Sequence, residues 1–265
     1  KGVLAISIAT ATSCTMNSQS VAFTELKPNK NGVHYYKGQP YTGKATRSNG
    51  PDYREEFNFK SGKLHGPYEE WLEKVLISSG TYSHGLRDGK WMQRDVSHCG
   101  TRVPGEPEPS PAIHGSRVVT DYQKGTIHGK KIRWNEFDEK ESEDTYNQGE
   151  LVSSIRYNNA GKKASEAIYE NNKLVKESAW TLNGPLWSVV THRSEGDKEL
   201  ITTTMYYDNG NKKSESSTLG GNQHGRQVTY YKNGNLKSLQ WFDDGLPKGP
   251  REDYHDNGIL GERGP

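Results

Sequence analysis

The segment Tyr82-Ser-His-Gly85-Leu-Arg-Asp-Gly89-Lys-Trp91 contains the pattern that decides the fold: an aromatic residue, a glycine three residues later and another glycine four residues after that. The pattern recurs along most of the 265-residue chain. Its other copies are Phe59-Gly62-Gly66, Tyr122-Gly125-Gly129 and Phe242-Gly245-Gly249, and Thr218-Gly221-Gly225 keeps the glycines without the aromatic residue. Such periodicity is typical of a repeat protein, in which each unit buries its apolar face only against its neighbours.

The second glycine of each copy, here called the marker glycine, sets a period of 23 to 24 residues. The markers Gly43, Gly66 and Gly89 are 23 residues apart, and Gly225 and Gly249 are 24 apart. Asn-Gly pairs that begin at Asn209, Asn233 and Asn257 are also 24 apart. Marker positions without glycine fall at Ser153, Val175 and Ile201. The period predicts about nine units.

Each unit is predicted to be a β-hairpin. Asn-Gly is a strong hairpin signal because both residues tolerate the positive φ of a type I′ turn. Val228 and Tyr230 lie two residues apart before such a pair, as Ile132 and Trp134 do in another unit, and therefore share a strand face. Helical spacing of apolar residues is nearly absent. We therefore predict an all-β fold, an elongated array of antiparallel β-hairpins that forms one extended, twisted sheet.

A row of aromatic side chains is expected on one face of this sheet. Trp71, Trp134, Tyr230 and Tyr254 each lie five residues after a marker position. Aromatic side chains bury large areas, so few aliphatic residues are needed. That matters because only 30% of the residues are apolar. Such a composition alone favours disorder, but a disordered chain has no reason to keep a fixed repeat.

The units resemble MORN repeats. The resemblance lies in Tyr82-x-x-Gly85-x-x-x-Gly89-x-Trp91 and in Tyr122-x-x-Gly125-x-His128-Gly129. The run from Tyr231 to Ser238, followed by Phe242 to Gly249, is closer to the bacterial variant found in YwqK-type "antitoxin" proteins. The resemblance covers roughly residues 31 to 261. It implies a non-catalytic β-repeat scaffold that contacts proteins or membranes.

The first residues differ from the rest of the chain. Lys1 precedes an apolar stretch, and small residues lead to Cys14. This order fits a secretory signal. It also resembles a bacterial lipobox, whose cysteine is acylated, although Ala11 stands where leucine is usual. We expect lipidation at Cys14 and a lipid-anchored location in the cell envelope, on the periplasmic face of the outer membrane. The alternative is a short buried or disordered apolar strand.

The expected organisation has five parts. They are a signal with lipobox at 1–14, a linker at 15–30, repeats at 31–96, a proline-rich insertion loop at 97–116 and repeats at 117–265. Only two cysteines, Cys14 and Cys99, occur, so acylation of Cys14 leaves no partner for an internal disulfide. A bridge between the two cysteines is the alternative.

The insertion loop is one candidate partner-binding element. Gly89 and Gly129 are 40 residues apart, about 16 more than one unit. The excess contains Pro104, Pro107, Pro109 and Pro111. Prolines prevent strand pairing and favour an extended, exposed chain, and long loops on regular scaffolds are often binding elements. A tolerated insertion without function is the alternative.

An acidic run is the second candidate partner-binding element. Its members are Glu136, Asp138, Glu139, Glu141, Glu143 and Asp144. The run falls where the repeat places a hairpin turn. It is either a solvated turn or a docking patch for a basic protein.

The sequence shows no constellation that predicts catalysis, a metal or a cofactor. His65, His128 and His224 share one repeat position, but units about 10 Å apart cannot bring them within the roughly 2 Å that zinc ligands require. The glycines lack the lysine-serine ending of a phosphate-binding loop. Lys plus Arg number 35 and Asp plus Glu 33, so the net charge of +2 gives no pull toward nucleic acid. An enzyme would need a pocket with converging titratable groups.

The sequence therefore predicts a non-enzymatic scaffold that binds a protein. In its concrete form it is an envelope-anchored immunity or antitoxin-like lipoprotein that sterically neutralises a secreted toxin. The alternative is a structural envelope lipoprotein that binds membrane or cell-wall components.

Labelled palmitate will be incorporated into the wild-type protein but not into Cys14→Ser, because the thiol is the acylation site. Autoradiography of the purified proteins checks this. Equal labelling of both proteins would remove the lipoprotein interpretation.

Overall fold

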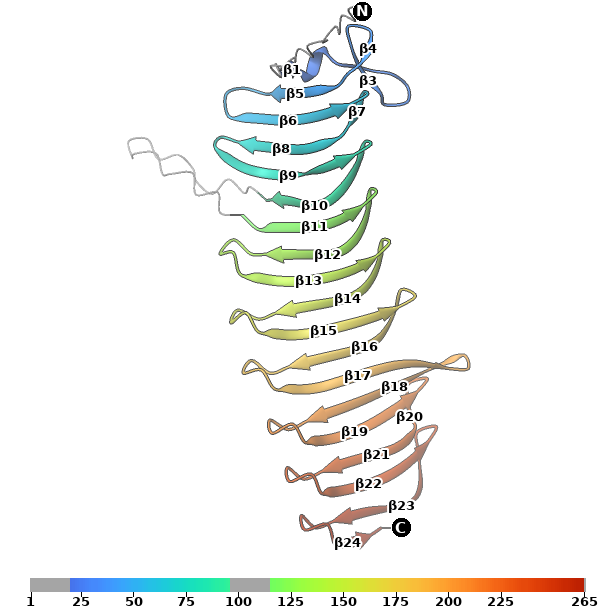
Figure 1. Cartoon of the computed structure of the whole chain (residues 1–265). Coiled ribbons are helices and arrows are strands. Elements are labelled where there is room, and N and C mark those ends of the chain that lie inside the picture. The colour runs from blue at the N-terminus through green and yellow to red at the C-terminus, as the bar shows by residue number, and fades with distance from the viewer. Residues whose placement is uncertain (1–19, 96–114, 265) are drawn as a thin grey trace, which may run out of the picture.

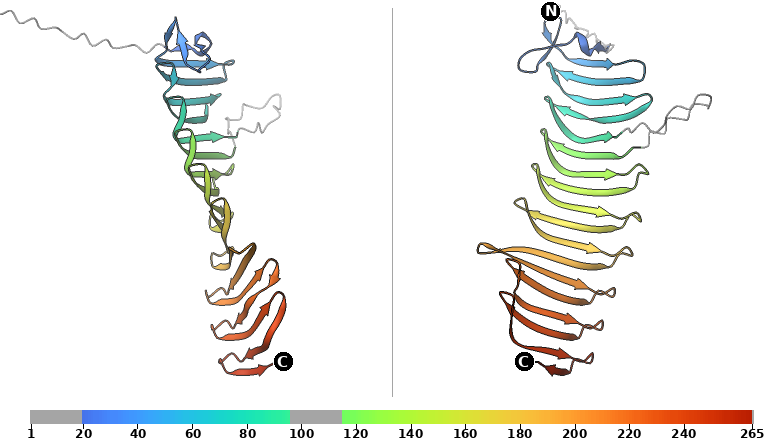
Figure 2. Two further views of the ribbon diagram at one scale, coloured as in Figure 1. Left: turned by 90° about the vertical axis from the view of Figure 1, so that its right-hand side faces the viewer. Right: turned by 180° about the vertical axis from the view of Figure 1, so that it is seen from behind.

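The computed structural model describes residues 20–95 and 115–264, and most of them form one long, open sheet (Figure 1). From β5 to β24, consecutive strands pair antiparallel, hairpin after hairpin. The exceptions are the short strands β7 and β20: β6 pairs with both β7 and β8, and β19 with both β20 and β21. The predicted fold class, an elongated array of antiparallel hairpins, is confirmed. Edge-on, the sheet is a single twisted layer over most of its length (Figure 2).

The sheet begins with the strands that precede the insertion. These are β5 (Gly43–Ser48), β6 (Tyr53–Lys60), β7 (Lys63–Leu64), β8 (Gly66–Leu72), β9 (Val75–Ser83) and β10 (Leu86–Arg94). It continues with β11 (Arg117–Gln123), β12 (Thr126–Trp134), β13 (Lys140–Asn147), β14 (Glu150–Tyr157), β15 (Lys163–Glu170), β16 (Lys173–Trp180), β17 (Leu186–Glu195), β18 (Lys198–Tyr206), β19 (Lys212–Leu219), β20 (Asn222–Gln223), β21 (Gly225–Tyr230), β22 (Leu236–Asp243), β23 (Leu246–Tyr254) and β24 (Leu260–Arg263).

The first glycine of the repeat pattern closes the hairpins at one edge of the sheet. Ser83 pairs with Leu86 around His84, with φ 53°, and Gly85, with φ 89°. The same arrangement recurs at Gly125, where the preceding lysine also has positive φ. Positive φ at both central residues defines the type I′ turn. The type I′ turns therefore lie along the edge of the sheet that contains Gly85 and Gly125.

The Asn-Gly pairs form a different turn, so the type I′ geometry predicted for them is wrong. Gly210 has φ 86°, but Asn209 keeps a negative φ. The Gly210 N–H donates to the Tyr207 carbonyl at 3.0 Å, which marks a type I turn followed by a left-handed glycine. The Asn209 side-chain oxygen accepts the N–H of Asn211 at 3.2 Å. This local hydrogen bond gives asparagine its role here.

The marker glycine lies in a β-bulge. Between the pairs Thr120–Lys131 and Tyr122–Ile127, one residue of β11 faces three residues of β12, including Gly129 with φ 104°. At Ser153, where the marker glycine is missing, the bulge shrinks to one extra residue. The unit without a marker glycine at Ser153 thus keeps its strand pairing and loses only part of the bulge.

A small cap covers the start of the sheet. It comprises β1 (Val21–Ala22), the 3-10 helix η1 (Phe23–Glu25), β2 (Lys27–Pro28), β3 (His34–Tyr36) and β4 (Gln39–Pro40). Strand β1 pairs parallel with β5, and β2, β3 and β4 form a separate small sheet. Residues 20–30, expected to be part of a linker, therefore belong to the folded body. The reason is apolar burial: Leu26 is only 4% exposed.

The contiguous cluster of buried hydrophobic residues lies at this end of the molecule, and Val228 in β21 is buried apart from it. The cluster consists of Leu26, Tyr41, Ala45, Phe57, Phe59, Tyr68 and Trp91, with Phe23, Tyr82 and Tyr122 packed against it. The rings of Tyr68 and Trp91 stack with centroids 5.5 Å apart. Beyond β11, the sheet has no second layer in the part of the chain that the structure describes (Figure 2).

The predicted aromatic row exists, but it does not form the core. Trp71 and Trp134 are half-buried on the face opposite Tyr68 and Trp91, as strand alternation from these residues requires. Cations cover them: the Arg117 guanidinium lies 4.1 Å from the Trp134 ring centre. Further pairs are Arg54 over Trp71, Lys140 over Tyr157 and Lys163 over Trp180. Cation–π contacts shield this row in place of a second layer.

We expect Gly80→Ala to destabilise the capped end by about 3 kcal/mol, because a Cβ there would lie 2.2 Å from Cδ2 of Trp91. Gly89→Ala is the matched control. Its Cβ would meet nothing within 4 Å, so only the left-handed backbone conformation costs free energy, about 1 kcal/mol. Urea unfolding followed by tryptophan fluorescence measures both. An equal or smaller effect at Gly80 would contradict the packing described.

Candidate functional site

The face of the sheet that carries the core continues past the cap as an uncovered surface, here called the groove face. Trp91 pairs with Thr120, Thr120 with Lys131 and Lys131 with Asp144. Directly paired residues project to the same side of a sheet. Lys131 and Asp144 therefore lie on the side that, in the first units, is filled by Trp91.

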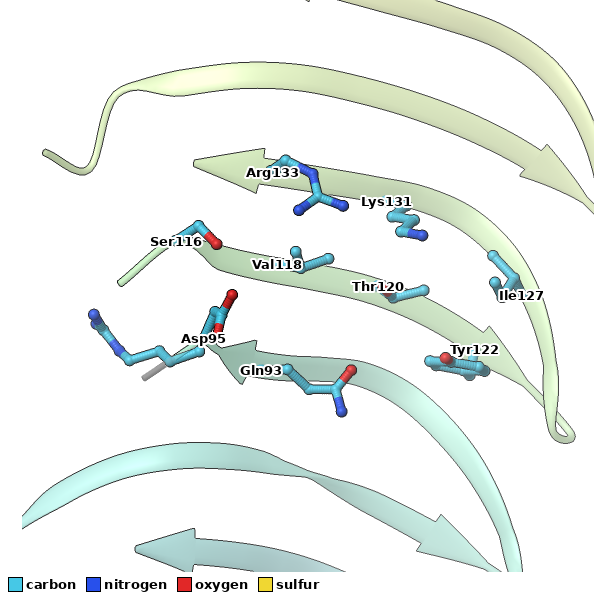
Figure 3. A pocket seen from close by; sticks show the side chains of 10 residues that line it. Gln93, Asp95, Ser116, Val118, Thr120, Tyr122, Ile127, Lys131 and Arg133 are labelled. Atoms are coloured by element: carbon cyan, nitrogen blue, oxygen red, sulfur yellow. The ribbon is translucent and has the colours of Figure 1, made fainter. Parts of the chain in front are cut away.

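A hollow of about 410 Å³ lies on the groove face where the core ends. Its lining is Gln93, Arg94, Asp95, Ser116, Val118, Thr120, Tyr122, Ile127, Lys131 and Arg133. Figure 3 shows side chains of β10, β11 and β12 arranged around it. A second hollow of about 270 Å³ shares Lys131 and Arg133 and extends to β14. The two together form a groove across β10 to β14.

Apolar pairs line the groove on the side of the type I′ turns. Tyr122 faces Ile127 across β11 and β12. Equivalent pairs follow at Tyr146–Leu151 and Tyr169–Leu174, and His192–Ile201 is the next. The aromatic residue of the repeat pattern thus supplies core at Phe59 and an open apolar wall from Tyr122 onward.

Cations occupy the floor of the groove. Lys131 and Arg133 make no ion pair with any other described residue, and Figure 3 shows both on the same side as Val118 and Thr120. One strand further, the Arg156 guanidinium donates to Asp144 at 3.0 Å, and the Ser154 hydroxyl donates to the same oxygen at 2.7 Å. The first part of the groove is therefore net positive, and the next is balanced.

The acidic run does not form one patch. Glu136, Asp138 and Glu139 lie in the turn expected there, and Asp138 pairs with Arg117 at 2.6 Å. Glu141, Glu143 and Asp144 lie instead in β13. Strand alternation sends Glu143 to the face opposite the groove and Asp144 into the groove. The six carboxylates are thus divided among a turn and two faces.

Glu143 is neutralised within the sheet. The Lys130 ammonium, 2.6 Å from its carboxylate, lowers the pKa of Glu143; burial opposes that shift, and Lys140 at 3.1 Å adds to it. The Glu143 side chain is only 12% exposed. The ion pair between Lys130 and Glu143 therefore joins β12 to β13.

The remaining predicted site residues lie outside the described part of the chain. They are Cys14 and the loop prolines Pro104, Pro107, Pro109 and Pro111. The last described residue before the loop, Asp95, and Ser116 after it both line the larger hollow. The described chain on either side of residues 96–114 therefore lies beside the groove.

The repeated histidines hold neighbouring turns together. The Gln148 N–H donates to Nδ1 of His128 at 3.2 Å, and the Lys124 N–H donates to Asp88, which occupies the same repeat position, at 3.1 Å. Within residues 20–95 and 115–264, no group of three or more His, Cys, Asp or Glu side chains is arranged to hold a metal ion. The described residues also include no helix with the length and apolarity needed to span a membrane.

Lys131 and Arg133 are the groove residues that the sequence prediction missed. A signal for Lys131 exists two residues after the marker glycine. That position holds Ala45, Tyr68 and Trp91 in the capped units and Lys131, Gln227 and Arg251 later. The switch from apolar to polar marks where the groove face ceases to be core.

Comparisons with known proteins add little. Neither models of protein families nor curated proteins match the sequence. Among solved structures, a porin-like protein from Bacteroides uniformis is similar at 8% identity with a TM-score of 0.22. That similarity covers 76% of this chain and 88% of the other.

Glu143→Gln should destabilise the protein by about 1 kcal/mol near neutral pH, because the amide loses the charge that Lys130 and Lys140 bind. The folded-state pKa of Glu143 lies below its unfolded value. Its contribution is therefore complete above the ordinary carboxyl pKa and disappears as the pH falls through the lowered value. Urea unfolding at neutral and strongly acidic pH checks this, with the exposed Glu141→Gln as control. A difference that persists in acid would contradict the ion pair.

Proposed function

We propose that the chain is a non-catalytic scaffold of MORN-type repeats that binds another protein through the groove face. In its concrete form, the protein is an envelope-anchored immunity or antitoxin-like protein that sterically blocks a secreted toxin. The observation that carries the proposal is the uncovered groove face, which runs in one layer from β11 to the last hairpins (Figure 2).

The chemistry of this face supports binding. An apolar wall of tyrosines and aliphatic residues lies beside a polar floor, an arrangement suited to holding an extended polypeptide. Tyrosine is favoured at protein interfaces because its large ring also carries a polar group. At the capped end, this face already packs against polypeptide, since Phe23 and Leu26 of the chain itself pack on it.

The arrangement of titratable groups supports a role without catalysis. Along the groove, Lys131, Asp144 and Glu177 lie on different strands, with Ser154 and Ala167 between the two carboxylates, and Asp144 is already bound by Arg156. Acid–base chemistry needs such groups to converge on one reacting atom. A long surface with distributed contacts instead suits steric occlusion of a partner.

A photo-crosslinking amino acid at Val118 should capture a protein partner in cell-envelope extracts, whereas the same amino acid at Val119 should not. The two valines are adjacent and both are half-buried, but alternation places Val118 in the groove and Val119 on the opposite face. Mass spectrometry of the adducts identifies the partner. Adducts of equal yield at both positions, or at neither, would overturn groove binding.

Growth rescue tests the immunity form of the proposal. Expression of the captured protein alone should arrest growth, and co-expression with this chain should restore it. A captured protein that is harmless when expressed would end the toxin version while leaving the scaffold role intact.

A further inference from the structure

We propose that the groove across β10 to β14 recognises an acidic polypeptide segment that carries an aromatic or aliphatic side chain. This inference rests on the proposed function and adds the chemistry of the partner. Lys131 and Arg133 bind the carboxylates, and the Tyr122–Ile127 pair receives the apolar side chain.

The charges of the groove favour an anionic partner. The larger hollow is lined by three cations, Arg94, Lys131 and Arg133, and by one carboxylate, Asp95. Many other cations in the sheet are already paired, for example Lys130 with Glu143 and Lys163 with Glu166. Lys131 and Arg133 have no such partner among the described residues. A cation without an intramolecular partner can bind a carboxylate without first breaking an ion pair.

The spacing of the cations suits an extended peptide. Lys131 and Arg133 are two residues apart on β12, so both project to one side of the sheet. Side chains two residues apart in a strand are about 7 Å apart, and alternate residues of an extended partner have the same spacing. Two acidic residues separated by one position therefore match the two cations.

An apolar subsite lies beside the cations. Tyr122 and Ile127 are paired across β11 and β12, and both line the hollow with Lys131 (Figure 3). Both are only half-buried. Tyr122 is held in place, because the Arg87 guanidinium lies 5.5 Å from its ring centre. A fixed, partly exposed aromatic ring offers contact area at little cost in conformational entropy.

The chain provides its own example of this kind of contact further up the same face. Phe23 in the cap packs on Phe57 with ring centroids 4.6 Å apart, and Arg47 lies over both rings. The Arg47 side chain in turn pairs with the carboxylate of Glu55. On the groove face of the capped end, an aromatic residue, an arginine and a carboxylate thus lie together. The open groove has the aromatic residue and the cations, and the partner supplies the carboxylate.

The same groove fits nucleic acid poorly. A phosphate backbone requires a continuous row of cations together with aromatic platforms for successive bases. Here the residues that follow Lys131 along the groove are Asp144, Ser154, Ala167 and Glu177. The positive region is short and is bounded by carboxylates, which matches a short acidic peptide.

The test uses the full chain and a fluorescein-labelled peptide of glutamates around one central tyrosine, with binding measured by fluorescence anisotropy. We expect binding that weakens with added salt. Lys131→Glu with Arg133→Glu should weaken binding by about tenfold. The neutral double variant Lys131→Gln with Arg133→Gln should weaken peptide binding by about threefold. This variant replaces the charge-reversal variant in the test if the latter does not fold.

The control is Lys176→Glu with Arg226→Glu, which makes the same change in net charge on the opposite face. Neither residue is ion-paired within the described residues, and strand register places Lys176 beside Ile168 and Thr191, away from the groove. This control should change peptide binding by less than about twofold. Equal weakening by both double variants would overturn the inference, because the effect would then come from overall charge.

Two further probes decide the class of partner. An oligodeoxythymidylate or a phosphatidylglycerol vesicle that binds more tightly than the peptide would overturn the inference. No peptide binding, together with a protein adduct at Val118, would overturn the acidic-partner inference and leave the proposed function standing. Absence of the adduct at Val118 would instead remove the proposed function itself.

Discussion

One hydrogen bond, repeated from unit to unit, fixes how the hairpins stack. The N–H of the type I′ turn glycine donates to a carbonyl of the preceding unit: Gly85 to Leu64 at 2.7 Å, Gly125 to Arg87 at 2.8 Å and Gly149 to Ile127 at 2.8 Å. The turn bends toward its neighbour only because the glycine adopts positive φ. The side chain before several marker glycines, such as His128 or Asp88, accepts the adjacent turn N–H. Turn stacking therefore aligns the strands that the ladder then pairs.

A single-layer sheet must be stabilised without a continuous core. In this molecule the stabilising contacts lie at the turns along the sheet edges and on the face opposite the groove. In the C-terminal units, Asn209 and Asn211 donate to the Lys232 carbonyl, and Asn233 and Asn235 donate to the Asp256 carbonyl. On the face opposite the groove, cations cover aromatic rings and pair with glutamates. Each contact contributes little alone, but the period repeats it along the sheet. The groove face beyond the cap is thereby left uncovered (Figure 2).

The groove has its character because the core ends within the sheet. The position that buries Tyr68 and Trp91 is Lys131 in the next unit, and the aromatic position that buries Phe59 is only half-buried at Tyr122. The pairing of β10 with β11 continues unbroken across this transition. The surface on which the chain's own cap packs is therefore continued, with charges added, as an uncovered surface.

The sequence by itself determined the fold class, because glycines at a fixed period leave few structures other than stacked hairpins. It also placed the acidic turn at Glu136 and the shared face of Trp71 and Trp134. It could not show that Asn209 belongs to a type I turn, since a local side-chain hydrogen bond decides that geometry. Only the tertiary structure revealed the folded cap, the separation of Glu143 from Asp144 onto opposite faces, and the groove at Lys131. Those features depend on register and on the bulge at each marker glycine, which shift side chains between faces by single residues.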